Sequence, residues 1–187
     1  ALVSIATRRA AVMRAALAAG ARIVNDVTAL AGDPESLPIV AESGAAVVLM
    51  HMQGEPRTMQ QDPTYRDAPL DIYDFFTERL AACAAAGIAP ARIALDPGIG
   101  FGKRDPHNLA ILADLALYHG LGCALLLGVS RKSFIGRLSS GEDADHRLAG
   151  SLAAVLAGLD RGVQVIRVHD VAETAQAVAI WQAIADT

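Results

Sequence analysis

Polar and charged residues follow the short apolar runs of this chain, at the point where each run ends. These strand-end residues are Asn25-Asp26, His51, Asp96-Pro97-Gly98, Ser130-Arg131-Lys132 and Arg167-Val168-His169-Asp170. If the runs are parallel strands of a barrel of strands and helices, their carboxyl ends share one face, and the active site of such barrels lies there. One such residue could simply cap the following helix. Five sets together predict a binding or catalytic site.

Cationic side chains form one part of this predicted site. Lys132, Arg167 and His169 follow the last two runs, and we expect Arg131 and Lys103 nearby, although the chain as a whole has a net charge of −4. A concentrated cationic site in an acidic protein favours a phosphate or pyrophosphate ligand, because lysine and arginine make charge-assisted hydrogen bonds to such groups.

Two further residues supply a different kind of recognition. Asn25 and Asp96 each end an apolar run and provide an amide and a carboxylate. Both groups could hydrogen-bond the N–H edge of a flat heterocycle. The sequence therefore predicts a ligand that has an anionic end and a polar ring.

The glycine-rich segment 96–103 (DPGIGFGK) matches no standard phosphate-binding loop. It is not a Walker P-loop, because Pro97 stands where the first glycine belongs and Arg104 where Ser or Thr is needed. It is not a Rossmann fingerprint, because no helix opens inside it. We expect its glycines, Gly100 among them, to let the backbone approach a ligand, with Phe101 offering a stacking face. A flexible turn is the alternative interpretation.

Two other chemistries find less support in the spacing. His51 and His169 could bind zinc, but no HxxxH or HxH spacing accompanies them, so no metal ligand is predicted. Lys132 could form a Schiff base in a lyase. Arg131 lies directly beside it and no proton relay is apparent, so borohydride trapping on Lys132 would be needed to favour that alternative.

The elements that must position these residues alternate along the chain. Apolar runs predict strands at residues 2–5, 22–27, 46–50, 92–95, 124–129 and 163–168. Helical periodicity predicts helices at residues 8–19, 34–42, 70–86, 106–119, 144–159 and 172–184, with C-cap glycines at Gly20, Gly44, Gly87, Gly120 and Gly162. This alternation predicts an α/β fold with one parallel sheet, both faces of which are buried because the runs are continuously apolar. Residues 52–68 are expected to form a long irregular connection with a functional role.

Composition narrows the class of protein. The 187 residues are 53% hydrophobic and 19% charged, which excludes a disordered chain and predicts one domain over residues 1–187. Cys83 and Cys123 form no CxxC pair, which favours a reducing, cytoplasmic location. The longest nearly apolar stretch, residues 148–159, is too short to span a membrane, and no basic run is present. Neither a membrane nor a nucleic acid is therefore predicted as a partner.

Five segments also carry a family resemblance. They are residues 23–27 (IVNDV), 49–59 (LMHMQGEPRTM), 96–103 (DPGIGFGK), 128–136 (GVSRKSFIG) and 166–171 (IRVHDV). In this order and combination, spread over the whole chain, they resemble the dihydropteroate synthase family. The wider group of pterin-binding enzymes shares the fold but not this set, so a pterin-dependent methyltransferase is the nearest alternative enzyme.

The resemblance implies a fold and a reaction. The fold is a TIM-type (β/α)8 barrel. The reaction joins hydroxymethyl-dihydropterin pyrophosphate to p-aminobenzoate and releases dihydropteroate and pyrophosphate, a step of folate biosynthesis that sulfonamides block. It also implies Mg2+ with the pyrophosphate, small-molecule substrates as partners, and a homodimer.

The resemblance further implies roles for individual residues by motif position. The implied catalytic residues are Lys132, Arg167 and His169. The implied substrate-binding residues are Asn25, Asp96 and Lys132 for the pterin, Arg167 and His169 for the pyrophosphate, Ser130, Lys132 and Phe101 for p-aminobenzoate and the pterin ring, with Met50, Val27 and Gly100 completing the set.

Two features depart from the family pattern. Where the family has Ser-Ile-Asp-Thr, residues 4–7 read SIAT, so Ala6 replaces a carboxylate of the pterin pocket. Loss of such a buried hydrogen-bond partner costs about 1–3 kcal/mol. The chain also shows six strand–helix units, whereas a (β/α)8 barrel has eight and about 250 residues. We therefore expect the first two units to be absent, and a non-catalytic pterin-binding fragment is the alternative function.

Overall fold

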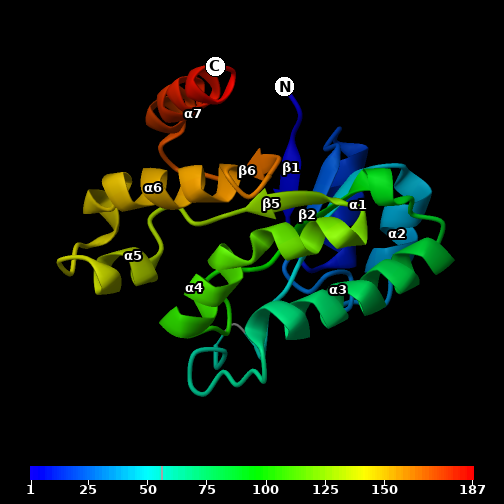
Figure 1. Ribbon diagram of the computed structural model, residues 1–187. Coiled ribbons are helices and arrows are strands. Elements are labelled where there is room, and N and C mark those ends of the chain that lie inside the picture. Colours follow the sequence, from blue (N-terminus) through cyan, green and yellow to red (C-terminus); the bar gives the residue numbers. More distant parts are fainter. Residues whose placement is uncertain (56) are drawn as a thin grey trace.

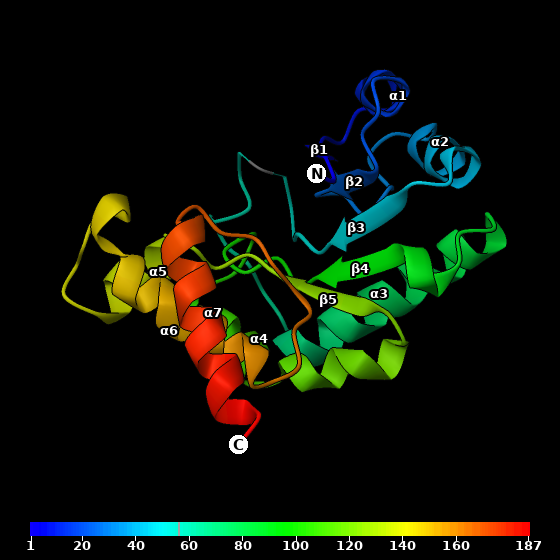
Figure 2. The same cartoon turned by 90° about the horizontal axis from the view of Figure 1, so that it is seen from above.

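A parallel sheet of six strands forms the centre of the structure. The computed structural model describes residues 1–55 and 57–187. The strands are β1 (Ser4–Ala6), β2 (Ile23–Asp26), β3 (Ala46–Met50), β4 (Ile93–Asp96), β5 (Ala124–Leu127) and β6 (Val165–Ile166). They pair side by side in sequence order, and every pair is parallel. Seen from above, the sheet curls into an open half-barrel with β1 and β6 as its edges (Figure 2).

Helices follow the strands and cover the outer side of the curl (Figures 1 and 2). They are α1 (Ala10–Ala18), α2 (Ser36–Ser43), α3 (Ala68–Ala85), α4 (Asp105–Ala113), α5 (Ser133–Leu138), α6 (Leu148–Leu159) and α7 (Val171–Ala185). Short 3-10 helices occupy Pro90–Arg92, Leu115–Leu121 and Ala144–His146. Over the described ranges, no helix is both long enough and apolar enough to cross a membrane. The predicted α/β class with one parallel sheet is confirmed.

The two faces of the sheet have different surroundings. Register places Asp26, Leu49, Leu95 and Leu125 in one row, and each of these side chains is at most 1% exposed beneath the helices. The inner row, which includes Asn25, lines a cavity of about 380 Å³. The prediction that both faces are buried is therefore only partly right for the inner face: Val48, Met50 and Leu126 are buried there, whereas Asn25, Ala46 and Ala94 are partly exposed along the open curl.

Some predicted boundaries are also wrong. The helix expected at residues 106–119 ends at Ala113 and gives way to the 3-10 helix, so the left-handed cap is Gly122 (φ 71°) rather than Gly120. The helix expected at 144–159 divides into a 3-10 turn and α6. Helix α5 was not predicted, because six residues are too few to show a helical period.

The connection between β3 and α3 is long and irregular, as its composition predicts. It ends where Asp67 caps α3 by accepting a hydrogen bond from the backbone N–H of Leu70 at 3.1 Å. Tyr65 donates a hydrogen bond to the carbonyl of Gly102 at 2.8 Å, and the Gln60 amide donates to the carbonyl of Gly100. The segment therefore lies against the glycine-rich loop after β4.

Candidate functional site

The curled sheet brings several of the predicted site residues to its inner face. Asn25 pairs with Val48, and Met50, two residues further along β3, pairs with Asp96. Side chains two residues apart point to the same face of a strand, so all three candidates share the inner face. Arg167 follows β6 directly and lines the same cavity as Asn25. The strand ends thus bring an amide, a thioether, a carboxylate and a guanidinium to one side of the sheet.

Asp96 is the buried carboxylate of this group, with 5% of its surface exposed. It accepts a hydrogen bond from the backbone N–H of Gly98 at 2.8 Å. Burial raises the pKa of Asp96, while nearby Lys132, the Gly98 N–H and Arg167 act in the opposite direction. A carboxylate that has few protein partners and is surrounded by cations can accept hydrogen bonds from a ligand.

Lys132 lies near this carboxylate and also contacts Phe101. The Lys132 ammonium donates to the carbonyl of Ile99 and sits 4.6 Å from the centre of the Phe101 ring. A Cβ on Gly100 would be 3.4 Å from Lys132 Cδ, so the lysine stem packs directly on the glycine. Burial lowers the pKa of Lys132 to about 8, and Asp96 opposes that shift. The loops after β4 and β5 therefore meet over the inner face.

Asn25 has an unused hydrogen-bonding atom. Its Oδ1 is buried and finds no partner among the residues that the structure describes. Ala6, the departure from the family motif, pairs with Asn25 in the sheet and so occupies the adjacent inner-face position. A buried, unpaired amide oxygen costs free energy unless a ligand donates to it.

Asp26, the next residue, has a structural role instead. It points to the helical side, is fully buried, and accepts hydrogen bonds from the Thr28 hydroxyl and N–H and from the Leu30 N–H at 2.8–3.0 Å. These bonds hold a turn in which Ala29 and Leu30 adopt positive φ. Val27, a predicted substrate-binding residue, lies half-buried within this turn.

The loops after β5 and β6 are joined by polar contacts. His169 donates its backbone N–H to the Ser130 hydroxyl at 3.2 Å, and its ring Nδ1 lies 3.0 Å from the same oxygen. The Arg131 guanidinium pairs with Asp170 and, at 3.0 Å, with Asp145. Arg131 is thus neutralised by carboxylates, whereas Arg167 and His169 remain exposed at the rim.

Lys103 and His51, which the sequence places near the site without a substrate role, are joined to each other there. Lys103 is only 2% exposed, and its ammonium lies 3.0 Å from His51 Nδ1, 3.0 Å from the Phe101 carbonyl and 3.3 Å from the His51 carbonyl. Burial lowers the pKa of Lys103 to about 7 and that of His51 to about 3. The alternation of Gly98, Gly100 and Gly102 was the available signal, because it allows the loop to turn Lys103 back toward β3.

These residues do not fit a magnesium ion by themselves. Within residues 1–55 and 57–187, no group of three or more His, Cys, Asp or Glu side chains could hold a metal. The groups that act most strongly on Asp96 are cations, whereas Mg2+ prefers several oxygen ligands. We therefore assign no step of the chemistry to a metal held by these side chains.

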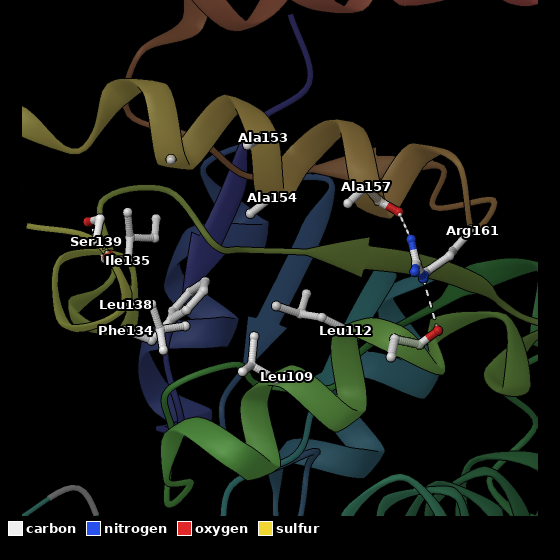
Figure 3. A pocket seen from close by; sticks show the side chains of 12 residues that line it. Leu109, Leu112, Phe134, Ile135, Leu138, Ser139, Ala153, Ala154, Ala157 and Arg161 are labelled. Atoms are coloured by element: carbon white, nitrogen blue, oxygen red, sulfur yellow. Dashed lines mark hydrogen bonds between the residues drawn. The ribbon is translucent and has the colours of Figure 1, made fainter.

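A second hollow lies on the outer side of the sheet and lacks the candidate residues. Its volume is about 420 Å³, and apolar side chains of α4, α5 and α6 line it, including Leu109, Phe134 and Ala154 (Figure 3). Arg161 crosses one end and donates to the carbonyls of Ala113 and Ala157. The guanidinium of Arg161 thus holds helices together. The candidate site therefore remains at the strand ends.

Comparison with known proteins identifies the family to which this chain belongs. Residues 1–169 match the family model described as pterin binding enzyme. The chain is 44% identical over 181 residues to a dihydropteroate synthase of Escherichia coli K12, which covers 97% of this chain but 64% of that relative. The chain therefore spans less than two thirds of that relative's length.

Solved structures give the same result in three dimensions. The dihydropteroate synthase of Stenotrophomonas maltophilia with active site-bound imidazole superposes with a TM-score of 0.95 at 44% identity, covering 98% of this chain and 69% of that one. The Xanthomonas albilineans enzyme in complex with 7,8-dihydropteroate gives 0.93 at 42% identity, covering 100% and 68%. On the family match and these likenesses, the chain belongs to the pterin-binding enzyme family.

Proposed function

We propose that the strand-end site is the substrate site of a dihydropteroate synthase. It would join hydroxymethyl-dihydropterin pyrophosphate to p-aminobenzoate and release dihydropteroate and pyrophosphate. The observation that carries this proposal is the shared inner face, which combines the buried carboxylate of Asp96 and the unpaired amide oxygen of Asn25 with cations above them. The relative that holds 7,8-dihydropteroate, the expected product, supports it.

The pterin ring would lie in the hollow. Its N–H groups match the acceptors that Asp96 and the Asn25 oxygen offer, and Met50 provides an apolar wall between them. A carboxylate held in a dry site also favours positive charge on the ring. Asp96 would therefore bind the transition state, in which the methylene next to the ring becomes cation-like, more tightly than the substrate.

The pyrophosphate would leave toward the exposed cations. Breaking the bond between the methylene carbon and the pyrophosphate oxygen places extra negative charge on the leaving group. Arg167 and His169 stand at the rim where that charge develops, and the Lys132 ammonium is nearby. Stabilising developing charge in this way is a large source of catalysis. No nucleophile from the protein is needed.

The amine of p-aminobenzoate would then form the new carbon–nitrogen bond and lose a proton. The Phe101 ring, Gly100 and the Ser130 hydroxyl would border the approach to the methylene. The flat ring of p-aminobenzoate can pack against an aromatic face of this kind. We assign these three residues, as a proposal, to that second substrate.

The sheet would be six of the eight strands of a (β/α)8 barrel, and residues 1–187 would form one pterin-binding domain. Two observations support this: β1 and β6 lie at the edges of the curled sheet, and the relatives are longer than this chain. Further strands of the longer proteins would add at those edges. Val27, in the turn after β2, would face the substrate only in that closed form.

A homodimer and a cytoplasmic location are part of the proposal. The dimer would form through α6 and α7, because Val171, Ile180 and Ile184 on α7 are 60–71% exposed. Measurement of the molecular mass by light scattering would test the dimer.

Cys83 and Cys123 are both free and buried, which suits a reducing compartment such as the cytoplasm.

A non-catalytic pterin binder is the second candidate, and Ala6 is the observation that favours it. Incubation of the chain with the pterin pyrophosphate, p-aminobenzoate and Mg2+, followed by chromatography for dihydropteroate, separates the two. Product formation that requires both substrates is expected for the synthase. Saturable pterin binding without product would establish the binder, and a folded chain that binds no pterin would overturn both.

A further inference from the structure

The loop after β4 is held against the end of β3 by backbone contacts of unusual closeness. A Cβ on Gly98 would come within 1.9 Å of the His51 carbonyl oxygen, and a Cβ on Gly102 within 2.3 Å of the Gln53 carbonyl oxygen. Both glycines also have positive φ. The two loops therefore touch backbone to backbone, and side chains at these positions would push them apart.

The buried side chain of Lys103 links the same two loops by hydrogen bonds. An ammonium has three protons to donate, and three acceptors surround this one: His51 Nδ1, the His51 carbonyl and the Phe101 carbonyl. Two of the acceptors are on the β3 side and one is on the loop after β4. The lysine therefore ties the two loops together with its full donor capacity, in a position that is 2% exposed.

The histidine is itself fixed in place. Its ring meets the Phe75 ring edge-on at a centroid distance of 4.9 Å and an interplanar angle of 84°. His51 N–H donates to the carbonyl of Asp96 at 3.0 Å, which continues the β3–β4 ladder. Lys103 is thus anchored to a rigid element, and the Phe101 carbonyl that it binds belongs to the residue whose ring lies under Lys132.

We propose that Lys103 is a positioning residue of the pterin site: its buried ammonium holds the loop after β4 so that Phe101 and Gly100 stand ready against the ligand. The inference rests on the proposed function. Lys103 makes no assigned contact with substrate and acts through the loop backbone. Binding then needs little loop ordering, and preorganisation of this kind raises affinity.

Hydrogen–deuterium exchange and pterin titration together test the proposal. Lys103→Met keeps the length of the side chain but removes all three donors. We expect exchange at the amides of residues 98–103 to rise at least tenfold while the strands β1 and β5 keep their protection. Affinity for hydroxymethyl-dihydropterin pyrophosphate should fall about tenfold or more. The matched control is Arg104→Met, which removes the neighbouring cation, whose side chain pairs with exposed Asp62.

A second pair of variants covers the case in which Lys103→Met does not fold. His51→Leu removes one acceptor and should produce a smaller change of the same kind, whereas His51→Asn returns an oxygen acceptor and should restore the wild-type exchange and affinity. A general loss of stability would raise exchange throughout the sheet and would not be rescued by Asn.

Each outcome has a definite meaning. Unchanged exchange in the 98–103 loop, or increased exchange with unchanged pterin affinity, overturns the positioning role and leaves the proposed function intact. A folded wild-type chain that binds no pterin overturns the proposed function, and the positioning role for this ligand with it. The inference is established if hydrogen exchange rises at residues 98–103 and pterin binding weakens in Lys103→Met or His51→Leu, while His51→Asn keeps the wild-type exchange and affinity.

Discussion

The two halves of the site are built in different ways. At the ends of β3 and β4, His51, Asp96 and Lys103 are 7%, 5% and 2% exposed and bond to each other's loops. At the end of β6, Arg167 and His169 stand exposed. We refer to these as the buried half and the open half.

The difference matches the two ends of the proposed substrate. A ring that must be recognised by its hydrogen-bond edge benefits from dry, fixed partners, because water does not compete there. A pyrophosphate that must leave benefits from cations in contact with solvent, because release requires the charge to be rehydrated. The buried half would therefore set specificity, and the open half would set anion affinity and release.

The largest effect should come from the buried half. Asp96→Asn removes the charge while keeping the shape, and it should weaken pterin binding at least about 100-fold, since one acceptor oxygen becomes an NH2 donor that faces the ring N–H groups and the remaining bond is no longer to a charged group. Isothermal calorimetry measures the change, with Asp114→Asn at an exposed helix end as the control. Equal affinity in wild type and Asp96→Asn would remove Asp96 from the site.

A substitution in the open half should reduce affinity for the pyrophosphate of the ligand and leave affinity for the pterin ring nearly unchanged. Arg167→Met should weaken the pyrophosphate ester about 30-fold yet leave hydroxymethyl-dihydropterin, which lacks the pyrophosphate, within about twofold of wild type. Arg66→Met, an exposed arginine paired with Asp71, is the control. A parallel loss for both ligands would mean that the two halves are not separable as described.

A gain of binding is expected at the position next to Asn25. Ala6→Asp places a carboxylate beside the unpaired amide oxygen on the inner face. It should strengthen pterin binding about tenfold, in line with about 1–3 kcal/mol for a buried hydrogen-bond partner. Ala6→Asn tests whether the charge matters. Weaker binding of Ala6→Asp than of wild type would show that the ring does not reach β1.

The buried half should also give the stability of the chain, rather than its ligand binding, a dependence on pH. Lys103 has a pKa that burial lowers to about 7, against 10.5 in the unfolded chain. Between those values the unfolded chain binds more protons, so the free energy of unfolding should rise with pH from about 7 to about 10, by about 1 kcal/mol per pH unit. Urea denaturation at several pH values measures this slope. A slope that is as steep in Lys103→Met as in wild type would contradict the assignment.

Much of this arrangement could be predicted from residue patterns. The apolar runs locate the strands, and since parallel strands end on one face, Asn25, Asp96 and Arg167 had to meet. The partnership of Lys103 with His51 could not be predicted, because it joins residues 52 positions apart and depends on the register that sets Met50 against Asp96. The separate roles of Asn25 and Asp26 likewise follow from which face each occupies, and that is fixed only by the pairing of the strands.

The most direct test of the account is a calorimetric titration of this chain with hydroxymethyl-dihydropterin pyrophosphate and Mg2+, beside the Asp96→Asn variant. The account predicts saturable binding to wild type at one site per chain and at least about 100-fold weaker binding to the variant. A chain that is folded by circular dichroism and binds no pterin, or that binds it equally well without the Asp96 charge, would contradict the central claim.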